Sequence, residues 1–243
     1  MNVKKFLSLS AALACALLFS ACEGDNSVSV TEKLIGEANI QPNTPTEPSS
    51  EGNTPAGQAS TETLLVDDFE DGDAMSALGD AWYSGTDAGS GAESTIEPGA
   101  KDAEGHPSPS KTDNGSKNAL SFKYTLKKGN YEYDAYVGWG VHLPESKDYS
   151  KYTGISYRYK GGSHIIRIET SDVKDYNYHG KRMNATEEWT PVTLEFSKLA
   201  QEEGWGTAVD FDPSHITGFS IQVKGPDDTD SLAIDDVYLI ASP

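Results

Sequence analysis

The stretch YVGWGVHL at residues 136–143 decides the fold, because its side chains alternate between two environments. One face carries Val137, Trp139, Val141 and Leu143. The opposite face carries Tyr136, Gly138, Gly140 and His142. Successive side chains of a β-strand point to opposite sides of a sheet, so this pattern predicts a strand with one face in an apolar core.

The same period of two recurs along the domain, at residues 120–124, 155–159, 192–196, 219–223 and 232–239. Turn clusters such as residues 161–163 and 226–228 separate these segments. Only residues 197–203 have a briefly helical pattern. About ten short strands without alternating helices are typical of two packed antiparallel sheets. We therefore predict an all-β domain, a β-sandwich jelly roll of the galactose-binding-like kind.

Residues 1–21 are predicted to be a lipoprotein signal peptide. Lys4 and Lys5 precede an apolar run that is too short to span a bilayer. The run ends in LFSAC at residues 18–22, which resembles a bacterial lipobox and makes Cys22 the lipidation site. The alternative is ordinary cleavage after Ala21. We expect an exported protein that is lipid-anchored in the cell envelope, at the outer membrane or cell surface, and touches the membrane only through that anchor.

Residues 22–63 are predicted to be a disordered linker, because Pro, Thr, Ser and Gly dominate and no hydrophobic period is present. Its prolines favour an extended spacer. Such a linker would carry the domain away from the membrane, or it is a remnant of domain shuffling. Residues 64–243 then form one domain, long enough to bury a sizeable core.

The charge balance restricts the partners. The chain has 19 basic and 38 acidic residues, a net charge of −19. An acidic surface repels phosphate backbones, which argues against nucleic acid, and it suits a neutral ligand. Residues 101–117 are rich in Pro, Ser, Asp and Gly. We interpret them as a long surface loop, with a lid over a site as the alternative.

Sequence signatures of catalysis are weak. The segments GISYR at 154–158 and GFSIQ at 218–222 lack the second glycine of a nucleophile elbow. The five histidines show no metal-ligand spacing. A glycosidase needs two facing carboxylates, and an acidic domain offers too many pairs to nominate one. We predict that the domain is not an enzyme.

The non-core face of residues 136–143 has the character of a ligand site. Tyr136 beside two glycines would leave a shallow trough with a flat ring at its end, and sugar rings stack on such rings. The alternative is that the glycines mark a bulge or a tight sheet contact. Further candidates lie where loops or polar strand faces are expected: Tyr83, Tyr178, Trp205 and Arg167. Together they predict a cleft lined by rings.

A second signal is acidic. Phe69 must face the core, which places Asp68 and Glu70 on the opposite side of the first strand. The first and last strands of a jelly roll are often adjacent, so Asp235 of the last strand would approach them. Carboxylates that lie this close repel each other unless a cation is present. We predict a structural calcium ion held by Asp68, Glu70 and Asp235, with a solvated acidic turn as the alternative.

Several segments in this order and spacing resemble family 11 carbohydrate-binding modules. They are VDDFE at 66–70, WYSG at 82–85, Tyr136 eight residues before Pro144, Trp189 before VTLEF at 192–196, and IDDV at 234–237. The resemblance spans nearly all of residues 64–240. It implies a jelly roll with a concave cleft for single β-1,4 or mixed β-1,3-1,4 glucan chains, and structural calcium.

Position by position, the resemblance implies stacking roles for Tyr83 and Tyr136 and a hydrogen-bonding role for Asp175. Trp205 replaces a tyrosine of the family. Departures occur at Glu202, Gly204 and Val223, where the family shows arginine, aspartate and tyrosine. They imply a shorter cleft or another glucan.

The sequence therefore predicts a surface-tethered, non-catalytic module that binds β-glucan by ring stacking. We expect it to aid capture or degradation of polysaccharide, with separate glycoside hydrolases as candidate partners. One alternative is a small jelly-roll glucanase. The other is an envelope protein that uses the sandwich for protein contacts, in which case the candidate rings are buried or face a partner.

Overall fold

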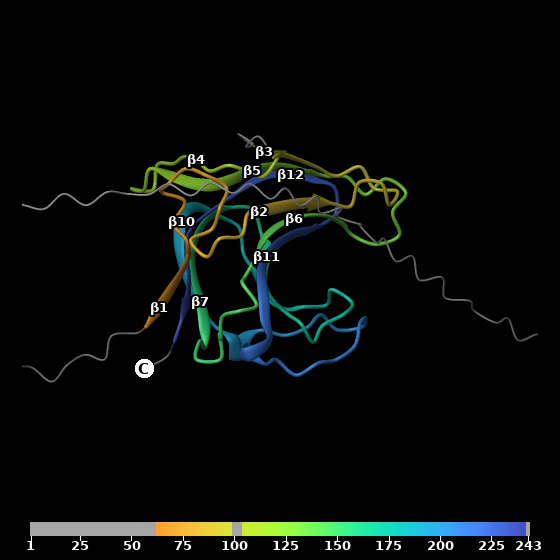
Figure 1. The fold of residues 1–243 in the computed structure, drawn as a ribbon. Helices are drawn as coiled ribbons and strands as arrows, with labels where there is room; N and C mark the ends of the chain where they lie inside the picture. The colour runs from red at the N-terminus through yellow and green to blue at the C-terminus, as the bar shows by residue number, and fades with distance from the viewer. Residues whose placement is uncertain (1–61, 99–103, 242–243) are drawn as a thin grey trace, which may run out of the picture. The chain divides into compact units, whose positions relative to one another are not determined.

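The computed structural model describes residues 62–98 and 104–241. The predicted signal peptide, Cys22 and all but the last two residues of the predicted linker lie outside the described residues. The described part forms two antiparallel sheets that pack face to face, which confirms the predicted jelly roll (Figure 1). No helix among these residues is long and apolar enough to cross a membrane.

The larger sheet has seven strands. Its main path runs β10 (Thr186–Glu195), β7 (Gly154–Gly161), β12 (Asp228–Ile240), β5 (Asn118–Leu126) and β3 (Thr95–Pro98). The short strands β1 (Thr63–Asp67) and β4 (Ser110–Lys111) pair with β12 and β5. The first and last strands are therefore adjacent, as predicted.

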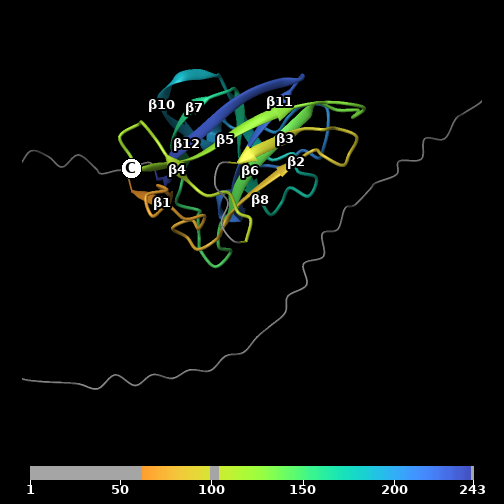
Figure 2. The same cartoon turned by 90° about the horizontal axis from the view of Figure 1, so that it is seen from above.

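The smaller sheet has five strands. Their order is β2 (Trp82–Thr86), β6 (Ala135–His142), β11 (Ile216–Gly225), β8 (His164–Thr170) and β9 (His179–Met183). Seen from above in Figure 2, β5 and β12 of the larger sheet lie over β6 and β11 of the smaller one. This arrangement leaves the outer face of the five-stranded sheet free to form a site.

The core lies between the sheets, and the alternation predicted its members. Val137, Trp139 and Val141 of β6 are at most 1% exposed. Trp139 meets Phe122 of β5 at a ring-centroid distance of 4.2 Å, which joins the two sheets. Phe69 is fully buried, as predicted. Because each large buried ring contributes about 1.5–3 kcal/mol, the core fixes the smaller sheet as a rigid platform.

Two sequence expectations need correction. The helical pattern at 197–203 is realised only as the 3-10 turn η1 (Phe196–Lys198), because the backbone is extended at Leu199 and turns that side chain toward the core. A second turn, η2 (Pro213–His215), was not predicted.

The described part of the long loop, residues 104–117, packs on the seven-stranded sheet rather than over the outer face of the smaller one. The Asn114 side-chain amide donates to Asp235 in β12, and the Trp189 indole in β10 donates to Asp113. The loop therefore behaves as a surface loop, and its described residues form no lid over the cleft described below.

Candidate functional site

A cleft of about 1000 Å³ lies on the outer face of the five-stranded sheet. This volume is at the upper end of the range usual for ligand pockets. Every residue that was predicted to contact ligand lines this cleft: Tyr83, Tyr136, Arg167, Asp175, Tyr178 and Trp205. Residues far apart in the sequence thus converge on one surface.

Glycine makes the floor of this cleft low enough for an aromatic ring to lie across it. Tyr83 in β2 pairs with Gly140 in β6. A Cβ atom at Gly140 would lie 2.7 Å from the Tyr83 hydroxyl oxygen and 2.6 Å from the carbonyl oxygen of Phe219. Both distances are far below van der Waals contact, so only glycine lets the ring cross β6 here. The sequence had offered two alternatives for these glycines, a shallow trough or a tight contact within the sheet, and the structure contains both.

The Tyr83 ring is held at its hydroxyl and on one face. Its hydroxyl donates a hydrogen bond of 3.2 Å to Glu169 in β8. His142 stacks on it, with ring centroids 5.0 Å apart. Burial, and then the Glu169 carboxylate, raise the pKa of Tyr83 far above its usual value, so this hydroxyl donates as a neutral phenol. Because His142 covers one face of the ring, the other face is the one that can meet a ligand.

Tyr136 stands at the start of β6, where Asp87 positions it. The buried Asp87 carboxylate accepts a hydrogen bond of 2.6 Å from the Tyr136 backbone amide. The Tyr136 ring stays half-buried beside Lys224 of β11, its cross-strand partner. A ring fixed by its backbone but open on one side is suited to stacking.

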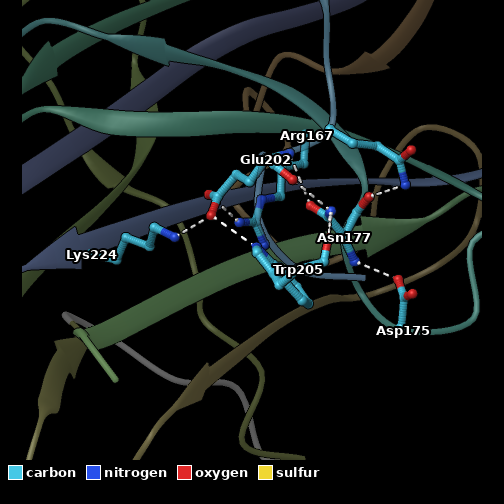
Figure 3. A network of polar contacts seen from close by, with 7 residues as sticks. Arg167, Asp175, Asn177, Glu202, Trp205 and Lys224 are labelled. Carbon is cyan, nitrogen blue, oxygen red and sulfur yellow. Dashed lines mark hydrogen bonds and ion pairs between the residues drawn. The ribbon is translucent and has the colours of Figure 1, made fainter. Parts of the chain in front are cut away.

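Buried charges occupy the β8 side of the floor. Arg167 and Glu169 are only 7% and 9% exposed. Arg167 donates to Glu202 at 3.0 Å, and Glu202 also accepts from Lys224 and from the indole of Trp205 (Figure 3). Burial alone would raise the pKa of Glu202, but Lys224, Trp205 and Arg167 outweigh it and hold the pKa below its usual value. Glu202 is therefore an ionised acceptor that fixes three donors.

Asn177 ties two loops into one wall of the cleft. It is 2% exposed, and its side-chain amide donates to the carbonyls of Glu202 and Trp205, each at 2.9 Å. Its side-chain oxygen accepts from the Glu202 amide at 3.0 Å (Figure 3). We call residues 175–178 and 201–207 together the clamped wall. It carries the rings of Tyr176, Tyr178 and Trp205 on the cleft side.

Asp175 belongs to this clamp. Its carboxylate accepts from the backbone amides of Thr207 at 2.6 Å and Asn177 at 3.2 Å. These two bonds lower the pKa of Asp175. The residue that was predicted to hydrogen-bond ligand therefore lines the cleft, but its oxygens already position the wall.

The opposite wall was missed by the sequence analysis. It is the loop between β5 and β6, residues 127–134, which we call the tyrosine loop. Tyr131 and Tyr133 line the cleft from this loop. Their ring centroids are 5.6 Å apart, and Tyr131 lies 6.5 Å from Tyr136. The signal that would have found them is the presence of two aromatic residues in a short polar turn, YEYD at 131–134.

Gln222 was also missed, and Val223 was placed on the wrong side. Val223 is 4% exposed in the core, whereas its neighbours Gln222 and Lys224 line the cleft. The family resemblance compared Val223 with a tyrosine of the cleft, and this alignment is wrong by one residue. In a strand, a shift of one residue exchanges the core face for the outer face. The Gln222 side-chain oxygen has no hydrogen-bond partner in the described part of the chain.

The residues predicted to bind calcium have partners within the chain. Glu70 accepts from the amides of Lys117 at 2.7 Å and Asn118 at 3.2 Å. Asp235 is fully buried, burial raises its pKa, and it accepts from Asn114. Asp68 accepts from the Glu70 amide. No group of three or more possible His, Cys, Asp or Glu ligands is arranged for a metal within residues 62–98 and 104–241. The calcium site stays a prediction, and these residues do not form a three-carboxylate cage by themselves.

The two-sheet jelly roll with a concave, ring-lined cleft on the outer face of one sheet defines a class of β-sandwich. Two solved structures share the fold. The family 11 carbohydrate-binding module of cellulosomal cellulase Lic26A-Cel5E of Clostridium thermocellum has a TM-score of 0.53 at 18% identity over 76% of this chain and 97% of that one. A family 11 module from Clostridium thermocellum, in complex with a β-1,3-1,4-mixed-linked tetrasaccharide, has a TM-score of 0.52 at 18% identity over 76% of this chain and 98% of that one. The chain has the fold of the family 11 carbohydrate-binding modules, as the sequence resemblance implied.

No protein-family model matches the chain. In sequence it is similar to Endoglucanase 3 of Fibrobacter succinogenes, with 43% identity over 178 residues. The match covers 72% of this chain but only 27% of the relative, so the chain spans little more than a quarter of that protein's length.

Proposed function

We propose that the chain is a non-catalytic carbohydrate-binding protein whose cleft takes a β-glucan chain, β-1,4-linked or mixed β-1,3-1,4-linked. The observation that carries the proposal is the convergence of Tyr83, Tyr136, Tyr178 and Trp205 on one cleft in the outer face of the smaller sheet. Rings with one open face suit the apolar faces of sugar rings. The family 11 module with a bound mixed-linked tetrasaccharide supports this choice of ligand.

The mechanism is binding by stacking, with orientation set by polar groups. A sugar ring stacks on Tyr136 and on the open face of Tyr83. Arg167, held by Glu202, presents its remaining donors toward sugar hydroxyls. A flexible glucan loses freedom on binding, so we expect affinity on the order of micromolar or weaker.

The same proposal includes the position of the protein in the cell. A lipid on Cys22 and a proline-rich linker would tether the module at the cell surface, where it would hold polysaccharide near separate glycoside hydrolases. The signal-like residues 1–21 and the composition of residues 22–63 support this. Calcium held near Asp68, Glu70 and Asp235 would be structural and would take no part in binding glucan.

A glucanase is the second candidate, favoured by the similarity to a protein named Endoglucanase 3. One carboxylate of the cleft, Glu202, does not fit the general acid of such an enzyme. A general acid of a glycosidase needs a raised pKa, whereas the pKa of Glu202 is lowered and its carboxylate is occupied by three donors.

Affinity electrophoresis of the purified chain in gels with and without barley mixed-linkage glucan tests the proposal. We expect retardation for the native chain and none for Tyr136→Ala. The matched control is Tyr238→Ala, because Tyr238 is also half-buried but lies on β12 in the other sheet. Unretarded migration of the folded native chain in gels with barley glucan, with xyloglucan and with hydroxyethyl cellulose would refute the proposal and favour the envelope-protein alternative. Release of reducing sugar from barley glucan would favour the glucanase.

A further inference from the structure

Large hydrophobic side chains are exposed at few places on the described surface, and most of those places are at the cleft. Among residues 62–98 and 104–241, the exposed ones are Met75, Tyr133, Tyr176 and Trp205. All of these except Met75 line the cleft. Tyr133 is 65% exposed and Tyr176 is 71% exposed, so these two rings have almost no packing role in the fold.

Tyr133 and Tyr176 are each the most exposed member of a row of neighbouring aromatic rings. On one side, the half-buried Tyr136 is followed by Tyr131 at 6.5 Å and then by the exposed Tyr133 at a further 5.6 Å. On the other side, the half-buried Tyr178 is followed by the exposed Tyr176 at 6.4 Å, with the two rings perpendicular. Both series begin on the half-buried part of the cleft and end at its rim.

The backbone at Tyr176 is held in an unusual conformation. Its φ of 66° lies in the left-handed region, which is costly for a tyrosine. The Asp175 and Asn177 hydrogen bonds on either side keep it there. Strain that the surrounding structure maintains is concentrated at functional sites. Here it holds an exposed ring at the rim of the cleft.

Tyr136 and Tyr178 are half-buried, so a linear chain on the floor would contact these two rings. Tyr133 and Tyr176 are exposed, so groups that project from such a chain would reach them. We propose that Tyr133 and Tyr176 bind single-sugar substituents of a branched β-glucan, while its backbone lies on the floor. This inference rests on the proposed function and specifies its ligand class as substituted rather than plain glucan.

The charge at the rim favours neutral substituents over acidic ones, because carboxylates outnumber the basic side chains Lys128, Arg167 and Lys224 among the lining residues. Glu132 and Asp134 flank Tyr133, and Glu203 lies near Trp205; all three carboxylates line the cleft and are exposed. Carboxylates accept hydrogen bonds from sugar hydroxyls, but they repel a uronic acid. The cleft volume of about 1000 Å³ leaves room for side groups.

Isothermal titration calorimetry with two ligands of equal backbone length tests the inference. The plain ligand is cellotetraose, and the substituted ligand is the xyloglucan heptasaccharide with the same four-glucose backbone. The full native chain is compared with the double variant Tyr133→Ala/Tyr176→Ala. The double variant Tyr133→Phe/Tyr176→Phe keeps both rings, and Met75→Ala removes an exposed side chain outside the cleft.

We expect the native chain to bind the heptasaccharide more tightly than the tetraose. The double alanine variant should lose about tenfold in affinity for the heptasaccharide and stay within about twofold for the tetraose, because each ring contact contributes only modestly. The phenylalanine variant and Met75→Ala should bind both ligands as the native chain does.

Three results would overturn the inference. Native binding of tetraose with equal or weaker binding of heptasaccharide would leave the proposed function standing and remove the branched ligand. An equal loss for both ligands in the alanine variant would assign the rim rings to the backbone. Absence of binding to either ligand by the folded native chain would remove the proposed function as well.

Discussion

The clamped wall and the tyrosine loop both present rings to the cleft, but they are held in different ways. Two side chains cross-link the clamped wall. The buried Asn177 donates to the carbonyls of Glu202 and Trp205, and the half-buried Gln201 donates to the carbonyls of Asn177 and Thr207. The tyrosine loop is tied mainly at its base, where the Asn130 amide donates to Gly91.

The tip of the tyrosine loop has much weaker support. Within the described part of the chain, residues 132–134 make no hydrogen bond, and Tyr133 has only its ring contact with Tyr131. A wall fixed before binding loses little freedom when a ligand arrives, whereas a loop tip can adapt to its shape at an entropic cost. Under the proposed function we therefore expect the clamped wall to set the orientation of the ligand and the tyrosine loop to adjust to it.

The largest effect should follow from removing the clamp. Asn177→Ala leaves the part-buried carbonyls of Glu202 and Trp205 without their donor, so we expect the free energy of unfolding to fall by about 1–2 kcal/mol. Affinity for barley glucan should fall about tenfold, because the wall rings lose their fixed position. Urea denaturation and calorimetry measure the two quantities.

The matched control for the clamp is Asn130→Ala. Asn130 is an exposed asparagine of the tyrosine loop, and in the described structure only its backbone forms a hydrogen bond. Its replacement should change the free energy of unfolding by less than about 0.5 kcal/mol. Equal effects of the two substitutions would mean that the walls are not held differently.

The sequence could predict which face of a strand each side chain occupies, because this depends only on neighbouring residues along that strand. The period of two placed Trp139 in the core and Tyr136 on the outer face. The pairing of β1 with β12 followed instead from the general arrangement of jelly rolls, in which the first and last strands are often adjacent. The period of two also explains the error at Val223, since one residue of misalignment reverses the face.

The clamp could not be predicted in this way. Asn177 and Glu202 are joined by bonds between segments 25 residues apart, and no local pattern marks that pairing. Asp175 was nominated only through the family resemblance, and its role in the structure depends on where the Thr207 amide points. Tertiary contacts determine the walls of the cleft, so the sequence could not predict them. The alternation of side chains along the strands determines the floor, so the sequence could predict it.

A change of pH should also distinguish the two walls, with a smaller effect on glucan affinity. Glu202 has a lowered pKa in the fold, so its ion pairs with Arg167 and Lys224 are fully present above its ordinary value of 4.5. Their contribution is lost as the pH falls through the lowered folded value, because the unfolded chain takes up the proton first. We expect glucan affinity to weaken about threefold to fivefold from pH 6 to a pH below the lowered pKa of Glu202.

The variants Glu202→Gln and Glu132→Gln assign this pH dependence. Glu202→Gln should bind more weakly than the native chain at pH 6 and change little on acidification, since its side chain no longer titrates. Glu132→Gln, on the tyrosine loop, should keep the native pH dependence, because no hydrogen bond of Glu132 is present in the described structure. If instead Glu132→Gln removes the acid effect, the rim carboxylates rather than the clamp control binding.

The smallest effect should come from the exposed ion pair at the base of the tyrosine loop. Lys127 pairs there with Glu93, and both side chains are more than half exposed. Water and salt screen such a pair, and the loop base is also held by the backbone bond from the Glu93 amide to the Lys127 carbonyl, which Lys127→Ala keeps. We expect an unchanged unfolding midpoint and an affinity for barley glucan within about twofold of native. A larger loss of affinity at an unchanged midpoint would show that this pair positions Tyr131 and Tyr133, and that the tyrosine loop is also fixed before the ligand binds.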